Sequence, residues 1–388
     1  MSRPMVKLGD VLSIIRGVTF KPNDQVEPLS EGSTIVMRTK NVQRSGLDIS
    51  DLIAIPDSFI KRDEQYLRSE DMLISSANSW ELVGKISFVE KLPARSTAGG
   101  FISIIRAKKE KVIPKFLYYW LTSEHTQVTI RNCGQKTTNI SNLNLERFKE
   151  LLIPLPPLND QRRIVTILDK AAGICQKREQ AINQSDNFLR ATFLEMFPQL
   201  DDRRNKVKLG DIVTLDALMV DPREDKFIDL IHIGPDRIER NTGLLLPALT
   251  AREENLISKK FLFDESYVLY SKIRPYLKKC AIPDFGGLCS ADMYPVKPIT
   301  GKTNREFIWQ LLLSDFFTKY TETLPDRANI PKLNRKELLS FELSLPPILL
   351  QEKYKAIVQK TNHAKLIMRT QNGNSILNKL ADELFLTN

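Results

Sequence analysis

The sequence predicts an α+β protein in which two α/β globules are separated by a pair of long antiparallel coiled-coil helices, with a pseudo-twofold internal repeat. Two observations predict this fold class. Short motifs recur in the same order in the two halves of the 388-residue chain. A long segment with apolar residues at helical spacing follows the last motif of each half. The length allows two or three domains, each able to bury its own core.

The internal repeat is carried by three pairs of short motifs. Residues 6–11 (VKLGDV) return as residues 207–212 (VKLGDI), at an offset of 201 residues. Two further pairs share an offset of 190, which makes the second globule about a dozen residues shorter. They are residues 139–144 (NISNLN) with 329–334 (NIPKLN), and residues 155–161 (LPPLNDQ) with 345–351 (LPPILLQ).

The two globules, residues 1–157 and 207–347, mix short strands with helical turns. Runs rich in Ile, Val, Leu and Tyr are broken by Gly, Pro, Asn and Asp, which is typical of strands joined by turns. A helical pattern comes late in each globule. The runs predicted as strands are residues 33–38, 71–75, 101–105 and 267–270, and those predicted as helices are 114–126 and 305–320.

One continuous helix is predicted for residues 158–197, the central helical region. Pro157 and Pro198 set its ends, because proline fixes its own φ and disfavours helix before it. At 1.5 Å per residue this helix is ~60 Å long. Its apolar seam runs in steps of three and four through Ile164, Leu168, Ala171, Cys175, Ile182, Leu189 and Met196, is widened by Ile167, Ile174, Ala181 and Phe188, and is interrupted at Arg178, Ser185 and Thr192.

A second helical region is predicted for residues 348–388, after a linker at residues 198–206. Its seam weakens at residues 371–375 (QNGNS), where we expect a kink or a stagger. A long helix with one apolar stripe must bury that stripe against a partner. The two helices are expected to pair antiparallel, since each begins at its own globule. The alternative is that each helix packs onto its own globule.

The charge balance favours a polyanionic partner. The chain has 57 Lys+Arg against 47 Asp+Glu, a formal net charge of +10. Its four cysteines contain no Cys-x-x-Cys pair, which predicts free thiols and no structural zinc site. No stretch is long and apolar enough for a membrane span, and the first residues lack the apolar core of a signal peptide. We therefore expect a soluble, cytoplasmic protein with no membrane partner.

The motifs of common enzymes are absent from the sequence. It contains no phosphate-binding loop, no Gly-x-Gly-x-x-Gly turn, and no Asn-Pro-Pro-aromatic or Asp-Pro-Pro-aromatic run that could hold a flipped adenine. Asp221 with Glu224 and Lys226 faintly resembles a nuclease cluster, but a charged, solvated loop is the better interpretation. No catalytic residue and no metal ligand is predicted.

The order of these motifs resembles that found in the specificity subunit of a Type I restriction-modification system, and the resemblance covers nearly the whole chain. The carrying motifs are the two openings, residues 6–11 and 207–212, and the two helix entrances, residues 155–161 and 345–351. Residues 14–20 (IIRGVTF) and 133–140 (CGQKTTNI) also resemble the start and the late polar loop of this family's target-recognition domains. The second globule departs from the pattern, with LDALM at residues 215–219, so the two halves are expected to read different sequences.

The resemblance implies a non-catalytic subunit that reads a bipartite, asymmetric DNA site, one half per globule. It implies double-stranded DNA, two methyltransferase subunits and restriction/translocase subunits as partners. S-adenosylmethionine, ATP and Mg²⁺ would bind those partners, and no cofactor is expected in this chain. Adenine N6 methylation and restriction of foreign DNA would be directed by this subunit. The half-sites would lie about one helical turn, roughly 34 Å, apart, with the spacer length set by the helices.

Residue types suited to DNA gather beside the predicted strands. Lys and Arg bind phosphates, whereas Arg, Asn, Gln, Ser and Thr also reach base edges. In the first globule the candidates are Arg16, Thr19, Lys21, Arg38, Lys40, Asn41, Gln43, Arg44, Ser75, Ser76, Asn78, Ser79, Lys85, Lys136, Thr137, Thr138 and Asn139. In the second they are Ser271, Lys272, Arg274, Tyr276, Lys278, Lys279, Arg327 and Asn329. Any one of these side chains could equally be an ordinary polar surface residue, but each stretch as a whole favours contact.

Two other functions stay open at this point. A self-sufficient DNA-binding regulator would bind its site tightly as an isolated chain, whereas a specificity subunit should need its methyltransferase partner. A single-chain methyltransferase or nuclease would be active with S-adenosylmethionine or Mg²⁺ alone, and the missing motifs argue against it.

Overall fold

A computed structural model describes residues 4–44, 46–135, 140–202, 206–324, 331–370 and 373–386. The chain divides into two compact units. Unit 1 comprises Met1–Arg178 with Gln371–Asn388, and unit 2 comprises Glu179–Thr370. The boundary between Arg178 and Glu179 falls inside α5 (Leu158–Met196), so each unit contains a globule and one part of this long helix.

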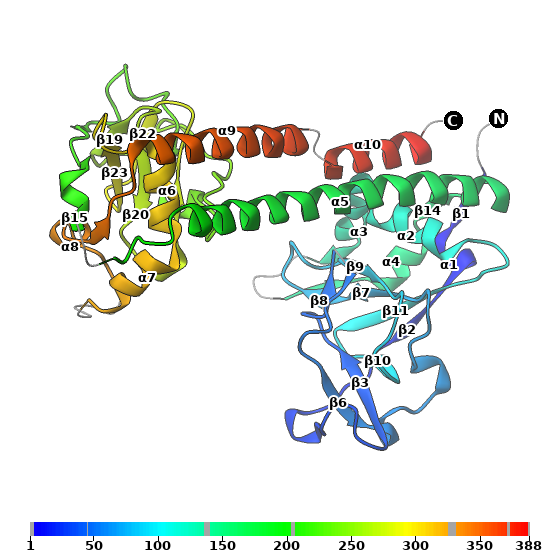
Figure 1. Cartoon of the computed structure of the whole chain (residues 1–388). Helices are drawn as coiled ribbons and strands as arrows, with labels where there is room; N and C mark the ends of the chain where they lie inside the picture. The colour runs from blue at the N-terminus through cyan, green and yellow to red at the C-terminus, as the bar shows by residue number, and fades with distance from the viewer. Residues whose placement is uncertain are drawn as a thin grey trace. The chain divides into compact units, whose positions relative to one another are not determined.

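Unit 1 is built on an antiparallel sheet in the order β2-β11-β7-β9. Figure 1 shows the short helices α2 to α4 on the side of this sheet that faces α5, with β3, β6 and β10 at its far end. The smaller sheet β10-β3-β6 contains a parallel pair, β10 with β3. The strands are β1 (Met5–Lys7), β2 (Leu12–Arg16), β3 (Ser33–Met37), β4 (Val42–Gln43), β5 (Gly46–Leu47), β6 (Ile53–Pro56), β7 (Met72–Ser75), β8 (Ala77–Asn78), β9 (Ile86–Phe88), β10 (Ser96–Ala98), β11 (Ile102–Ala107), β12 (Gly134–Gln135), β13 (Ser141–Leu143) and β14 (Leu152–Pro154). The helices are α1 (Leu8–Val11), α2 (Pro114–Thr122), α3 (Glu124–Asn132), α4 (Leu145–Lys149), the first part of α5, and α10 (Gly373–Leu386).

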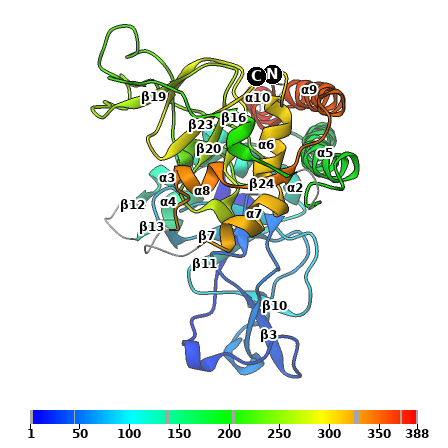
Figure 2. The same cartoon turned by 60° about the vertical axis from the view of Figure 1, so that its left-hand side comes forward.

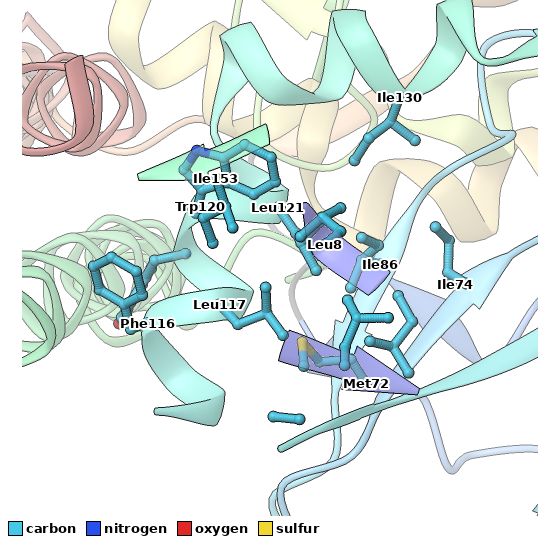
Figure 3. Close-up of a cluster of buried hydrophobic side chains, with 14 of the residues drawn as sticks. Leu8, Met72, Ile74, Ile86, Phe116, Leu117, Trp120, Leu121, Ile130 and Ile153 are labelled. Atoms are coloured by element: carbon cyan, nitrogen blue, oxygen red, sulfur yellow. The ribbon is translucent and has the colours of Figure 1, made fainter. Parts of the chain in front are cut away.

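The main core of unit 1 lies between this sheet and the helices. Figure 3 shows Met72, Ile74 and Ile86 from the sheet converging on Leu117 and Leu121 of α2. All five side chains are buried, because alternate residues of each strand and one face of α2 point into the same layer. This layer packs the sheet against the helices.

Unit 2 repeats this plan with shorter strands. Its central antiparallel sheet has the order β16-β23-β20-β21, and a second sheet, β17-β19-β22-β18, again contains a parallel pair, β18 with β22. Figure 2 shows α6 alongside β20 and β23. The strands are β15 (Lys206–Lys208), β16 (Val213–Thr214), β17 (Met219–Val220), β18 (His232–Ile233), β19 (Lys260–Phe263), β20 (Val268–Ser271), β21 (Cys280–Ala281), β22 (Gly287–Cys289), β23 (Met293–Pro298) and β24 (Glu342–Ser344). The helices are α6 (Arg305–Leu313), α7 (Asp315–Glu322), α8 (Arg335–Leu339), the second part of α5, and α9 (Ile348–Thr370).

The repeated sequence motifs lie next to one another at the base of each globule. The opening strand β1 pairs with the closing strand β14, with Val6 opposite Ile153. In unit 2 the opening strand β15 pairs with β24, with Val207 opposite Leu343. In both repeats, therefore, the opening motif forms a strand that pairs with the last strand of the globule, just before the long helix begins.

A buried glutamine fastens each long helix to its globule. Gln161 and Gln351, the last residues of the two repeated helix entrances, are fully buried. Gln161 Oε1 accepts from the Ile113 amide (2.8 Å), and its Nε2 donates to the carbonyl of Pro156 (2.9 Å). Gln351 Nε2 donates likewise to Pro346 O (2.8 Å), while its Oε1 accepts from the Thr303 hydroxyl (2.7 Å).

The long helices pair as expected, and the pairing also involves the globules. In unit 2, α5 and α9 run antiparallel: Tyr354 Oη donates to the carbonyl of Leu189, and further along α9 Lys365 forms an ion pair with Asp186. Tyr354 also packs against Phe193 in the core of the second globule. The two expected arrangements, helix on helix and helix on globule, are therefore both present.

In unit 1 the C-terminal helix α10 packs beside the first part of α5. Ala381 and Phe385 of α10 join Ile164 and Leu168 of α5 in the core of the first globule, and the ring of Phe385 lies edge-on to Phe116. The expected kink at residues 371–375 begins outside the described residues, since α9 ends at Thr370 and α10 begins at Gly373.

Parts of the predicted seam are wrong in detail. Ile174 and Phe188, predicted to widen it, are half exposed. A straight helix drifts relative to a seven-residue repeat, so a stripe of this length does not face one partner throughout.

The two late helical patterns are each broken by a serine. The helical stretches predicted at residues 114–126 and 305–320 are present, but each is divided into two helices, because Ser123 and Ser314 adopt extended backbone and start a new helix. Each hydroxyl accepts from a free amide of the helix that follows, Thr126 N or Phe317 N. A serine in this N-cap position stabilises the second helix and ends the first.

Candidate nucleic-acid interface

The loop of residues 38–51 is organised by a buried side chain. Asn41 is 1% exposed, and its Oδ1 accepts from the backbone amide of Arg38 (2.8 Å). Its Nδ2 donates to the carbonyls of Asp48 (2.8 Å) and Asp51 (3.0 Å). The amide of Asn41 is therefore occupied in holding the loop, so the base contact expected for it would require these bonds to break.

Two predicted cations of this loop share one carboxylate. The Arg38 guanidinium donates to Asp51 Oδ1 and to its carbonyl, both at 3.0 Å, and Lys40 forms an ion pair with the same carboxylate. Burial lowers the pKa of Arg38, which is half buried, whereas Lys40 and Asp51 are exposed. The loop thus presents positive groups at its surface, held in place by Asp51.

Lys85 joins this loop to the central sheet. Its ammonium group donates to Gln43 Oε1 (3.2 Å), and Gln43 Nε2 donates to the carbonyl of Lys40 (2.6 Å). Burial, with a contribution from nearby Arg44, lowers the pKa of Lys85. Lys85 is only 7% exposed and its ammonium group is bonded to Gln43, so the phosphate contact expected for it would require it to leave this position. Arg44 beside it is exposed.

The second predicted stretch, residues 75–79, follows strand β7. Ser75 is buried and accepts from Asn78 Nδ2 (3.1 Å), Ser76 shares a hydrogen bond with Ser103 (2.8 Å), and the Ser79 amide donates to Asn78 Oδ1 (2.9 Å). Strand β8 in this stretch pairs with β13, which pairs with β12. The predicted residues Lys136, Thr137, Thr138 and Asn139, which join β12 to β13, lie outside the described residues.

Three further predicted residues lie at the end of strand β2 or just after it. Arg16, Thr19 and Lys21 are all exposed. The intervening Gly17 must be glycine, because a Cβ there would lie 2.2 Å from the carbonyl oxygen of Gly99. This close approach places the segment beside the turn of residues 99–101. We call residues 16–21, 38–51, 75–79, 85 and 99–101 together the first polar surface.

Unit 2 presents a corresponding set of side chains after strand β20. Ser271 is buried, with its hydroxyl donating to Ile273 O (3.1 Å), whereas Arg274 and Tyr276 are exposed. Lys272 is mostly buried, and burial together with Lys332 lowers its pKa. The remaining described residues predicted here are Lys278, ion-paired with Asp315, and Lys279, which donates to Pro235 O (2.6 Å). Arg327 and Asn329 lie outside the described residues.

The two units share one backbone hydrogen-bond framework around these residues. The Ser75 amide donates to Lys85 O and the Ser271 amide to Lys279 O. The amides of Leu143 and Leu333 then donate to the carbonyls of Ser76 and Lys272. The described residues of the two polar stretches are therefore structural counterparts, although their side chains differ.

Sequence reasoning missed one loop of unit 2. The Gly99 amide donates to Met37 O just before the loop of residues 38–51, and the Ser290 amide donates to Ile233 O in the same way. The loop after Ile233, residues 234–246, is therefore the counterpart of residues 38–51. It contributes Arg237, whose guanidinium donates to Pro247 O (3.0 Å), and exposed Arg240.

A sequence signal for this loop exists. Residues 42–47 read VQRSGL, and residues 238–244 read IERNTGL, with one insertion. Both patterns begin with a buried aliphatic residue that lies opposite a leucine across the loop, Val42 opposite Leu47 and Ile238 opposite Leu245. We call residues 234–246, 271–279, 290–292 and 332 the second polar surface.

Other candidate chemistry is not supported by the geometry. Asp221 pairs with Arg223, which lowers the pKa of Asp221 to about 2, and Lys226 pairs with Glu224 (3.2 Å) on an exposed loop. Among the described residues, no group of three His, Cys, Asp or Glu side chains could hold a metal ion. Within the same ranges, no helix has the length and hydropathy needed to cross a membrane.

Comparison with known proteins decides the family. Residues 4–184 match the family model described as the Type I restriction modification DNA specificity domain. The MjaX specificity subunit, named for a type I restriction enzyme of Methanocaldococcus jannaschii, is 25% identical over 374 residues, which cover 91% of this chain and 84% of that protein. The chain belongs to the specificity subunits of Type I restriction-modification systems. A specificity subunit is itself non-catalytic, and catalysis lies in the partner subunits of such systems.

Other relatives match part of this specificity subunit or its fold. The specificity subunit of the Type I restriction enzyme EcoDI from Escherichia coli is 31% identical over 151 residues, which are 39% of this chain and a third (33%) of that protein. The crystal structure of a Type I restriction-modification S subunit from M. genitalium has a TM-score of 0.57 at 14% identity, covering 99% of both chains. A second structure, from work on complex assembly and conformational transition of the type I system, has a TM-score of 0.53 at 15% identity, covering 99% of this chain and 97% of that one. The whole-chain likeness supports the same fold, with two β-rich globules and long paired helices.

Proposed function

We propose that this specificity subunit reads a bipartite, asymmetric target in double-stranded DNA, with one half-site read by each polar surface. Residues 1–157 and 207–347 would be the two target-recognition domains. The subunit would thereby direct N6-adenine methylation, and restriction of foreign DNA, by its partner subunits. It would act in the cytoplasm, where its DNA and partners are found.

One observation carries this proposal. Two polar surfaces are built on the same backbone hydrogen bonds but carry different side chains, such as Ser76 in the first and Lys272 in the second. A shared framework gives both surfaces the same docking geometry, whereas different side chains select different bases. An asymmetric, two-part target is what such a pair of surfaces would recognise.

The proposed contacts divide by chemistry. Arg16, Lys21, Lys40 and Arg44 are exposed cations suited to phosphates, and Arg38 presents a planar guanidinium group suited to base edges. The amide of Gln43 is hydrogen-bonded to Lys85 and to the Lys40 carbonyl, so we assign it to loop structure. On the second surface Arg240, Arg274 and Lys332 take the phosphate role. We assign Asn41 and Ser75 to loop structure, because both are buried and their side chains are hydrogen-bonded within the loops.

The paired helices are proposed to dock the methyltransferase subunits. In unit 2 a shallow groove lies between the second part of α5 and α9, and Phe188 on its edge is 53% exposed. Exposed apolar side chains on a pair of helices favour the binding of a partner protein whose helices pack against them and bury them. The groove is lined by Ala181, Gln184, Ser185, Phe188, Lys360, Thr361 and Ala364.

Cofactors are assigned to the partner subunits. S-adenosylmethionine would bind the methyltransferase subunits, and ATP with Mg²⁺ the restriction/translocase subunits. This chain would supply sequence recognition and spacing alone.

The proposed function is tested by methylome sequencing of the host with and without this gene. We expect one split adenine-methylated motif to disappear with the gene and to return with a plasmid copy. An unchanged methylome would contradict the proposal. Binding of the isolated chain to its site as tightly as in the presence of the methyltransferase would favour a stand-alone regulator.

The spacer role of the helices gives a second prediction. Deleting one heptad of α5 between Ala171 and Asp186 should change the spacer of the methylated motif or abolish methylation, because seven residues remove ~10 Å of helix. The measurement is the methylome of a strain carrying the shortened chain. Replacing the same heptad with seven alanines, which keeps the helix length, is the control. Methylation at the original spacing by the shortened chain would contradict the role.

A further inference from the structure

The turn that precedes the central strand of each unit occupies the same place in both polar surfaces. The Ser76 amide donates to the Phe101 carbonyl (2.9 Å), and the Lys272 amide donates to the Asp292 carbonyl (3.1 Å). The next residue of each turn begins a strand, β11 or β23, that pairs with β7 or β20 in the same register. Phe101 and Asp292 are therefore structural counterparts.

Phe101 is an exposed aromatic residue among polar segments. It is 61% exposed, and it follows Gly99 and Gly100 in a tight turn beside Thr19. Its carbonyl is bonded by both Ser76 and Ala77, which fixes the turn against the loop of residues 75–79. Because these hydrogen bonds fix the backbone of Phe101, its ring stays at the surface. There it contributes little to the core and can contact an apolar group on a ligand.

Asp292 is a carboxylate balanced by two lysines. Its Oδ1 lies 3.6 Å from the ammonium group of Lys332 and 3.9 Å from that of Lys272. Both distances are longer than a hydrogen bond, so the half-exposed carboxylate keeps its acceptor capacity while its charge is offset. That offset matters beside DNA, where an unbalanced carboxylate would be repelled by phosphates.

The residues next to Phe101 differ from those next to Asp292. Lys272 corresponds to Ser76, and Lys332 corresponds to Asn142, because Lys332 lies opposite Ile273 as Asn142 lies opposite Ala77. At these two corresponding positions the first unit has the uncharged residues Ser76 and Asn142, and the second has Lys272 and Lys332. Each turn is equipped for a different kind of base edge.

We propose that Phe101 and Asp292 are equivalent specificity-determining residues of the two half-sites, an inference that rests on the proposed function. Phe101 makes an apolar contact with the 5-methyl group of a thymine in the half-site read by the first unit. Asp292 accepts a hydrogen bond from the N4 amino group of a cytosine in the other half-site. Both groups lie in the major groove, where each base pair presents a distinct pattern.

The test uses the full chain expressed with its methyltransferase partner in a host without related methylation. Phe101→Ala should relax the motif at one thymine of one half-site, and Asp292→Asn should relax one cytosine of the other half-site. Each loss of discrimination should be about tenfold or more. The controls are Leu152→Ala, at an exposed apolar residue, and Asp284→Asn, at an exposed aspartate, both outside the two polar surfaces, and these should leave the motif unchanged.

A base analogue identifies the contact. Replacing that thymine by uracil in a synthetic duplex removes only the methyl group, and it should slow methylation by the wild-type complex but not by the Phe101→Ala complex. Phe101→Leu, which keeps an apolar side chain, should retain the thymine preference. An unchanged motif in the Ala and Asn variants, relaxation of both half-sites together, or loss of all methylation in both Phe101 variants would each overturn the inference. Absence of a split motif in the wild type would instead contradict the proposed function.

Discussion

Replacing Lys365 by alanine is expected to destabilise unit 2 by about 3–5 kcal/mol. Lys365 of α9 and Asp186 of α5 form an ion pair whose side chains are only 6% and 8% exposed. Removing the lysine leaves the carboxylate buried without a counter-charge, which costs far more than the pair itself contributes. The measurement is the free energy of unfolding from urea-dependent hydrogen exchange, read on peptides of residues 179–370, with peptides of unit 1 as the internal reference.

Two control variants separate the buried charge from the loss of a side chain. Lys355→Ala removes the half-exposed partner of Glu352 on the same helix and should change stability by less than about 1 kcal/mol. The double variant Asp186→Leu with Lys365→Met replaces the pair by apolar groups and should recover most of the loss. If Lys365→Ala cost no more than Lys355→Ala, the buried pair would not be what fixes the register of the two helices.

Replacing Gln161 by leucine is expected to destabilise unit 1 by about 2–3 kcal/mol. The leucine has a similar size but cannot accept from the Ile113 amide or donate to the Pro156 carbonyl. Both backbone groups would then be left without a partner in the interior, where the desolvation penalty is not recovered. Hydrogen exchange of peptides at the start of α5 and in α2 measures the effect.

Gln351→Leu should likewise destabilise unit 2, because it would leave the Pro346 carbonyl and the buried Thr303 hydroxyl without their glutamine partner. Gln176→Leu, on an exposed position of α5, is the matched control and should change stability by less than about 0.5 kcal/mol. Equal effects of Gln161→Leu and Gln176→Leu would mean that the repeated glutamine is not needed to fasten the helix to the globule.

The sequence was a good guide to the elements of the fold. The strand predicted at residues 33–38 is β3 (Ser33–Met37), and the helix predicted at 158–197 is α5 (Leu158–Met196). These elements follow from local patterns, namely alternating apolar residues and flanking prolines. The errors came where a single polar side chain changed the local outcome, as Ser123 and Ser314 did by starting new helices.

The candidate site was only partly accessible from the sequence. The stretches at residues 38–44 and 75–79 do lie together in unit 1, linked through Lys85. Residue type alone could not show which of two neighbouring polar residues is available to DNA. The amide of Asn41 is buried and hydrogen-bonded within its loop, whereas Lys40 beside it is exposed. The DNA contacts themselves stay a prediction.

By itself, the sequence determined the duplication, the composition of each globule and the existence of long amphipathic helices, because these depend on local order and periodicity. Only the tertiary structure decided which distant segments share a core, such as Phe385 against Phe116, and which residues are counterparts, such as Phe101 and Asp292. Such pairings depend on long-range hydrogen bonds and close packing, which bring together residues that no pattern along the chain connects.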